Sequence, residues 1–347
     1  MIRFTWLQFR PQAIVALTAL FAFAIVLVVT GPHLAGLYAS SGITACHGGT
    51  CATVAGGFLS RLAITSPYPI VYELGIGLIL AVPAIIGIFW GAPLIARELE
   101  NRTFALAWTQ SITRTRWLVV KLVLIGLAAM AVTEALSLSY AWWANPISKA
   151  IGLQGPYPVA SEFGGNRLSL VIFASHGITP LGYAAFGFVL GTATGAFIRR
   201  AVPAMAVTLA IFAAAQVAMP LWVRPHLIPP DRTVVSGPSL VTSAGVNLGN
   251  LTATIVPGQP GAWITSSGAI ASGGQRVSTV PAACVPPPPA KPPDPGRCLG
   301  SRGIREAITY QPASRYWPLQ WIETGIFLAL SLALAGVCFW RLGRSRT

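Results

Sequence analysis

The sequence predicts an all-α membrane protein with six transmembrane helices and one large outer loop that contains some β-structure. Hydrophobic residues make up 54% of the 347 residues and charged residues only 9%, which is too few charges for the surface of a soluble protein of this length. Six apolar runs approach or exceed the roughly 20 helical residues that cross a bilayer, and none alternates like a barrel strand. The runs are 13–30, 70–96, 117–143, 178–198, 201–223 and 319–340.

The distribution of Lys and Arg predicts that both termini are cytoplasmic, because positive residues collect in the inner loops. The first run is longer than the apolar part of a signal peptide and lacks a cleavage site, so we expect an uncleaved anchor. With the N-terminus inside, twelve positive residues fall on the inner side and three in the short outer loops. The inner ones are Arg3, Arg10, Arg97, Arg102, Arg114, Arg116, Lys121, Arg199, Arg200, Arg341, Arg344 and Arg346, and the outer ones are Arg61, Lys149 and Arg167.

Three parts follow from this topology. Residues 1–223 hold five helices and an inner loop at 97–116, residues 224–318 form an outer domain, and residues 319–347 form the last helix and a basic tail. The outer domain is rich in Pro, Gly, Ser and Thr, and its four prolines at 286–289 favour polyproline structure. We expect a few short strands within 234–280. A structural cap is the plainer interpretation of this domain, and ligand binding is the alternative.

The cysteines agree with the same topology. Cys46 and Cys51 lie in the first outer loop, Cys284 and Cys298 lie in the outer domain, and Cys338 lies within a span. We predict the disulfides Cys46–Cys51 and Cys284–Cys298, since the outer side is oxidising. A metal site at Cys46 and Cys51 with the intervening histidine is the alternative, but three ligands are too few for a closed zinc site. We therefore expect no metal.

The chain lacks the motifs of several enzyme classes. Its three lysines are followed by Leu122, Ala150 and Pro292, so no Walker A motif is present. The His-Glu-x-x-His and Gly-x-Ser-x-Gly motifs are missing as well. The net charge of +14 is explained by residues that flank the spans, without a basic stripe with interleaved aromatics. We expect neither catalysis within this chain nor a nucleic-acid partner.

Polar and small residues within the spans suggest contacts. Glu134 falls near the middle of the third run, and it is either a group that contacts substrate or protons or a neutral side chain hydrogen-bonded to a neighbouring helix. Glu73 and Glu323 are interpreted as ordinary boundary residues. Small residues at a spacing of four let helices approach closely, within one chain or between two, and the single-chain arrangement is favoured. These residues are Gly87, Gly91, Gly187, Gly191 and Gly195.

The inner loop 97–116 is where charge is dense beside the membrane. Residues 97–108 are predicted to form a short helix with an apolar side and with Glu98 and Glu100 near its start. A rigid surface of mixed charged and apolar side chains suits the docking of a soluble partner.

This loop resembles the first cytoplasmic loop of ABC-2 type permeases, the six-span membrane subunits of ABC exporters. The resemblance rests on Arg97-Glu98-x-Glu100-x-Arg102-Thr103, on Thr109-Gln110-Ser111-x-Thr113-Arg114 and on Lys121. Residues 199–205 and 311–317 resemble the actinobacterial branch of the family.

The resemblance implies that 97–108 is a coupling helix in a cleft of an ATPase subunit. It implies two ATPase chains, which bind ATP and Mg, and a second permease chain that is identical or homologous. The location would be a bacterial plasma membrane, surrounded by lipid, and the substrate an exported amphipathic or hydrophobic compound. The residues assigned to ATPase coupling are Glu98, Glu100, Arg102, Thr103, Arg114, Arg116, Arg199 and Arg200.

Two other functional classes remain open at this point. A proton-coupled secondary transporter needs titratable groups at the bilayer midplane, and Glu134 is the candidate. A non-transporting sensor or assembly protein would instead be built around the outer domain.

Overall fold

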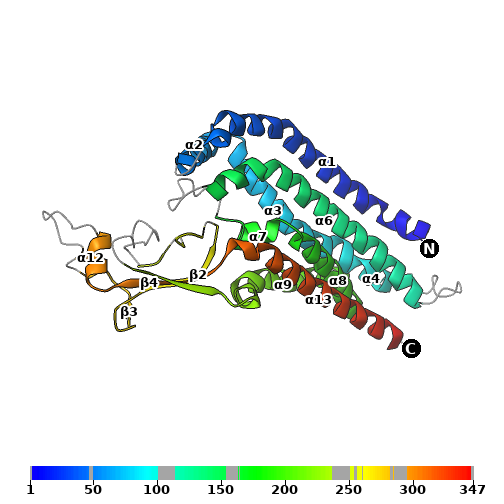
Figure 1. Ribbon diagram of the computed structural model, residues 1–347. Coiled ribbons are helices and arrows are strands. Elements are labelled where there is room, and N and C mark those ends of the chain that lie inside the picture. Colours follow the sequence, from blue (N-terminus) through cyan, green and yellow to red (C-terminus); the bar gives the residue numbers. More distant parts are fainter. Residues whose placement is uncertain are drawn as a thin grey trace.

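The protein is elongated, with a bundle of helices at one end and a small sheet at the other (Figure 1). Both chain termini lie at the end of the bundle that is farthest from the sheet. The computed structural model describes residues 2–46, 50–100, 114–153, 163, 165–236, 251–253, 256–259, 261–281, 284 and 295–344.

Six helices in the described part of the chain are long and apolar enough to cross a membrane, as predicted. Three of them are single helices that extend past the predicted runs, one closely matches its run, and two continue through a π-helical turn into a further helix. The spans are α1 (Ile2–Ser40); α3 (Tyr68–Ile86) with η2 (Gly87–Gly91) and α4 (Ala92–Glu100); α6 (Arg114–Leu153); α8 (Thr179–Ile198); α9 (Ala201–Ala218) with η4 (Met219–Val223) and α10 (Arg224–Leu227); and α13 (Tyr316–Arg344).

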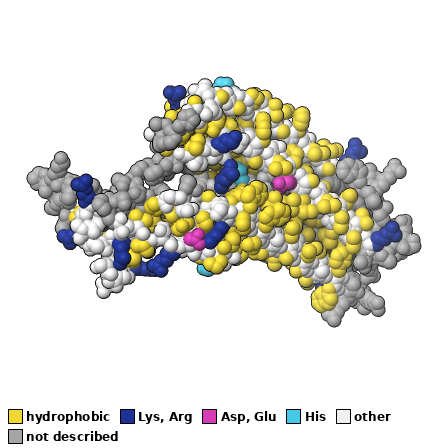
Figure 2. All heavy atoms as spheres, in the orientation of Figure 1, with side chains coloured by type: hydrophobic (Ala, Val, Ile, Leu, Met, Phe, Trp, Pro, Cys, Tyr) yellow, Lys and Arg dark blue, Asp and Glu magenta, His cyan; other side chains and the backbone are white. Residues whose placement is uncertain are grey.

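The outer surface of the bundle is apolar over most of its length, and Lys and Arg gather toward its two ends (Figure 2). Valine, leucine and tryptophan side chains that face outward include Val202, Leu332 and Trp321, which are more than half exposed. A surface of this kind is stable in contact with lipid, where apolar side chains need no covering. The structure and the composition therefore agree on a multi-pass membrane protein.

Helix α8 occupies the centre of the bundle. Nearly every residue from Thr179 to Ala196 is buried, whereas the other spans each keep an exposed face. Its neighbours include α3, α4, α6, α9 and α13. A helix that is apolar on all sides is expected only where other helices surround it.

Glycines let α8 approach the α3–η2–α4 helix until the two backbones touch. A Cβ atom added to Gly87 would lie 2.5 Å from the Gly187 carbonyl oxygen, and one added to Gly187 would lie 2.5 Å from the Pro83 carbonyl oxygen. Gly91 and Gly191 lie just as close to the backbone of the opposite helix. The small-residue motifs therefore pack helices within one chain, which confirms the favoured interpretation.

The four described strands form one antiparallel sheet in the order β1-β4-β2-β3. They are β1 (Asp231–Ser236), β2 (Trp263–Ile270), β3 (Arg276–Val277) and β4 (Arg305–Gln311). Strand β4 lies outside the segment 234–280 from which strands were expected, yet it pairs with both β1 and β2. The sheet covers a small core that includes Leu251, Cys284, Leu299 and Ile308.

Short helices complete the structure at the sheet end. They are η1 (Ile43–Ala45), α2 (Thr50–Ile64), α7 (Leu170–Ser175), α12 (Pro295–Ser301) and η6 (Ala313–Arg315). Both predicted disulfides are formed, Cys46–Cys51 beside η1 and α2, and Cys284–Cys298 beneath the sheet. Cys338 is a free, buried thiol. The two cross-links thus stabilise the loop-rich end of the molecule.

Glu306 of β4 is a buried acid that the sequence did not single out. Its side chain is fully covered, and neither carboxylate oxygen has a hydrogen-bond partner in the described part of the chain. Burial raises the pKa of this carboxyl from 4.5 to about 7, and the nearby Ala253 amide and Ser267 hydroxyl offset only part of that rise. The sheet is therefore destabilised as pH rises from about 4.5 to 7, because the unfolded chain releases this proton in that range while the folded state still holds it.

The contact between α8 and η2 yields the first prediction. Gly191→Ala should destabilise the protein by about 1–3 kcal/mol, because the added methyl group meets the backbone of η2. Gly325→Ala is the matched control, since nothing lies within 4 Å of the added Cβ. Thermal unfolding of the detergent-purified chain measures both. Equal melting temperatures for the two variants would contradict the close contact.

Candidate functional site

The first candidate site lies at the end of the bundle that carries both termini. Four helices meet there, because Ile95 of α4, Trp117 of α6, Ala196 of α8 and Cys338 of α13 belong to one buried apolar cluster. This packing fixes the positions of the polar residues at the ends of these helices.

Five arginines surround that cluster, and we call the surface they define the basic end. The guanidinium of Arg341 lies 5.7 Å from the centroid of the Phe197 ring, which connects the ends of α13 and α8 through a cation–π contact. The other four arginines are exposed. A surface of this kind attracts negatively charged groups. The five are Arg97, Arg116, Arg199, Arg200 and Arg341.

The turn between α8 and α9 is unusually sharp at Arg199. Its φ of 58° and ψ of 13° place a residue with a side chain in the left-handed region, at a cost of about 1–2 kcal/mol. The Arg199 amide donates to the Gly195 carbonyl oxygen at 3.1 Å. The hydroxyls of Thr194 and Thr208 are 2.6 Å apart across the same two helices. Packing of α8 on α9 thus holds the turn and presents Arg199 and Arg200 together.

The second candidate site is a buried polar cluster near the sheet end, made of Tyr183, Arg224, Gln320 and Glu323 and called here the ion-pair cluster. Arg224 and Glu323 are both 0% exposed. The Arg224 Nε donates to Glu323 Oε2 at 2.8 Å, and Nη2 donates to Oε1 at 3.0 Å. The Tyr183 hydroxyl donates to the same carboxylate. These bonds join α8, α10 and α13.

The remaining face of the Arg224 guanidinium is covered by α7. The guanidinium carbon lies 4.1 Å from the centroid of the Phe173 ring, and Nη1 donates to the Leu170 carbonyl oxygen at 3.3 Å. A buried guanidinium with these partners has the planar contacts and charge compensation that burial requires.

Gln320 of α13 joins the start of α8 to the end of α7. Its Oε1 accepts from the amides of Ile178 and Thr179, each at 3.0 Å, and from the Thr179 hydroxyl at 2.8 Å. Its Nε2 donates to the carbonyl oxygens of Phe173 and His176, each at 3.0 Å. Amides in the first turn of a helix have no partner within the helix, so this side chain from another helix caps α8.

A comparison with protein families identifies the bundle. The model of a family described as ABC-2 membrane transporter related matches residues 17–224, from within α1 to the first residue of α10. The chain belongs to this family. No curated protein and no solved structure matches the chain.

Membership in the ABC-2 family confirms the resemblance seen in the inner loop and supports an ABC transporter permease. Such permeases are in general membrane components without enzymatic activity, and they work with an ABC ATPase. The matched residues include the segment between α4 and α6 and the turn between α8 and α9.

The basic end of this ABC-2 protein contains several of the predicted coupling residues. Arg116, Arg199 and Arg200 lie there, and Glu100 is exposed at the end of α4. Their contact with a partner stays a prediction. Arg102 and Thr103 lie outside the described residues, as do most of the predicted coupling helix and the side chains of Glu98 and Arg114.

Glu134 lies at the middle of α6, as the sequence predicts, and is partly buried. Its Oε2 is buried without a hydrogen-bond partner in the part of the chain that the structure describes. Whether this carboxyl contacts substrate or protons, or is a neutral structural group, stays a prediction.

The interpretation of Glu323 as an ordinary boundary residue is wrong, because it is fully buried in an ion pair. Sequence reasoning also missed Arg224 and Gln320. The available signal was one basic residue directly after the fifth apolar run and one acidic residue shortly after the start of the sixth, at matching depths. Opposite charges at equal depth in two spans are expected to pair.

The ion-pair cluster yields the second prediction. Arg224→Met should destabilise the chain by roughly 3–5 kcal/mol, because it leaves the Glu323 charge buried and unpaired. Adding Glu323→Leu should recover most of this loss, since no charge then remains. Thermal unfolding of the purified full-length chain measures both variants.

The partly exposed ion pair between Asp231 and Arg315 provides the control, with its oxygen and nitrogen 2.6 Å apart. Asp231→Asn should cost less than about 1 kcal/mol, because water screens this pair. A double variant as unstable as Arg224→Met alone would show that the paired charges do not explain the loss.

Proposed function

We propose that this chain is the permease subunit of an ABC exporter and that its basic end docks a separate ATPase subunit in the cytoplasm. The observation that carries the proposal is that the ends of α4, α6 and α8, which lie within the matched ABC-2 region, pack with the end of α13 in one buried apolar cluster. The end of α4, the start of α6 and the turn at Arg199 and Arg200 all lie at this end of the bundle, so one partner bound there can contact all three.

The two ends of the molecule differ in a way that supports this orientation. Both disulfides lie toward the sheet end, and disulfides persist where the environment is oxidising. Exposed arginines occur at both ends of the molecule, but those of the basic end lie in short connections between spans, where positive residues set the cytoplasmic side, whereas long outer segments cross the membrane largely regardless of their charge. We therefore place the termini and the basic end in the cytoplasm and the sheet outside.

The proposed mechanism couples nucleotide binding to the centre of the bundle. Two ATPase chains bind ATP and Mg, close on one another, and move the coupling segment 97–108. This movement reaches α4 directly, and α4 packs against α8 beside Gly195, where a Cβ would touch the Ala92 carbonyl oxygen. A second permease chain, identical or homologous, completes the pathway. The spans present an apolar surface, which suits an amphipathic or hydrophobic substrate.

The third prediction tests docking. The double charge reversal Glu98→Lys and Glu100→Lys should reduce recovery of a Walker-motif ATPase with the tagged permease by about tenfold, because the proposal pairs these two carboxylates with basic groups of the ATPase, which lysines would repel. The measurement is quantitative mass spectrometry after purification in mild detergent.

The matched control reverses two exposed charges at the sheet end, Arg276→Glu and Arg302→Glu. These changes should leave the ATPase yield unaltered. Equal recovery of the ATPase with both double variants would remove the basis for placing the docking surface at this loop.

A further inference from the structure

One carboxylate in the membrane-spanning part of the chain lies on an exposed helix face. Glu73 is in the second turn of α3, about 7 Å along the helix from Tyr68. Its carboxylate forms no ion pair or hydrogen bond with any residue that the structure describes. A carboxylate without a partner beside apolar surface attracts a positive group.

The opposite face of α3 is buried against the other helices of the bundle. Val71, Tyr72, Gly75 and Ile79 are buried, and the Tyr140 hydroxyl donates to the Tyr72 carbonyl oxygen at 2.9 Å. Glu73 therefore cannot turn inward to find a partner without displacing packed side chains.

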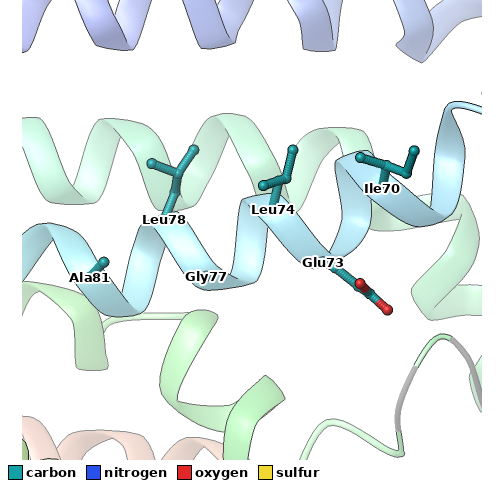
Figure 3. Close-up of a pocket in the computed structure, with 6 residues that line it drawn as sticks. All are labelled: Ile70, Glu73, Leu74, Gly77, Leu78 and Ala81. Carbon is teal, nitrogen blue, oxygen red and sulfur yellow. The ribbon is translucent and has the colours of Figure 1, made fainter.

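The exposed face of α3 carries a shallow groove of about 470 Å³ beside Glu73. Figure 3 shows the lining residues along one stretch of the helix, with the Glu73 side chain extending away from the α3 backbone. Apart from the carboxylate the lining is apolar. The lining residues are Ile70, Glu73, Leu74, Gly77, Leu78 and Ala81.

Small residues make the groove. Gly77 follows Glu73 by one helical turn, and nothing lies within 4 Å of where a Cβ would stand. Ala81 follows Gly77 by another turn, and the larger side chains of Leu74 and Leu78 line the groove beside these two small residues. From Glu73 to Ala81 the groove runs about 12 Å along the helix, with the charge at the end nearer the sheet.

We propose that this groove binds an amphipathic cation, with the positive group at Glu73 and the apolar body along Gly77 and Ala81. The charge complementarity is specific. The carboxylate repels an anion, and a neutral ligand in the groove would cover the carboxylate without pairing it. Amphipathic cations would then be the substrate class of the proposed exporter, and this part of the inference rests on the proposed function.

The fourth prediction uses labelled tetraphenylphosphonium, a hydrophobic cation, with the purified full-length chain in phosphatidylcholine nanodiscs. Equilibrium dialysis, corrected by empty nanodiscs, should show saturable binding that Glu73→Gln weakens about tenfold or more. Glu73→Asp should retain most of the affinity. Gly77→Leu should also weaken binding, because it fills the groove and keeps the carboxylate.

Tetraphenylborate, an anion of the same shape, should bind wild type more weakly than Glu73→Gln, because the carboxylate repels it. Thermal unfolding checks that the variants fold, as expected for two exposed positions. Equal affinity of wild type and Glu73→Gln for the cation would overturn the proposal. So would loss of a dimer, or of a tightly bound aminophospholipid seen by native mass spectrometry, in Glu73→Gln, because a second chain or a lipid would then be the partner of Glu73.

The assay needs no ATPase, so the two proposals fail separately. Glu73-dependent binding by a chain that recruits no ATPase would contradict the exporter and leave the site standing. Recruitment of an ATPase by a chain without Glu73-dependent binding would contradict the site alone.

Discussion

The structure depends on the direct contact between the backbones of α8 and the α3–η2–α4 helix. Five glycines make this contact, and at Gly87 and Gly187 even a methyl group would come within 2.5 Å of a carbonyl oxygen. In lipid there is no hydrophobic force between helices, so close packing of this kind is what holds them together. Every other span then packs around a helix whose position is already fixed, which explains why α8 is buried along its whole length.

The same helix joins the two polar sites. At the sheet end, Gln320 caps its first turn and Tyr183 reaches the Arg224–Glu323 pair. At the basic end, Gly195 lies against α4 and the chain turns sharply at Arg199. A displacement of α4 must carry α8 with it because no side chains separate them to absorb the movement. Helix α8 is in this sense the physical connection between the basic end and the sheet end of the bundle.

The elements predicted well from sequence are those set by local pattern. The length of the apolar runs located six spans, and the spacing of the glycines predicted close helix packing. The cysteines were paired correctly because the two members of each pair are close in the sequence and lie on the same predicted side of the membrane. What escaped prediction depends on residues distant in the chain. Arg224 and Glu323 are 99 residues apart, and β4 is a strand because β1 and β2 flank it. The exposed position of Glu73 was equally hidden, since a single sequence does not show which face of α3 the bundle covers.

The central claim is that the basic end, with the loop between α4 and α6, faces the cytoplasm while the sheet faces outward. Two matched substitutions test it in intact cells treated with a membrane-impermeant maleimide, Ser111→Cys in the loop and Ser272→Cys at an exposed position beside β2. The account predicts that Ser272→Cys is labelled at once and that Ser111→Cys is labelled only after the membrane is permeabilised. Labelling of Ser111→Cys in intact cells would contradict it.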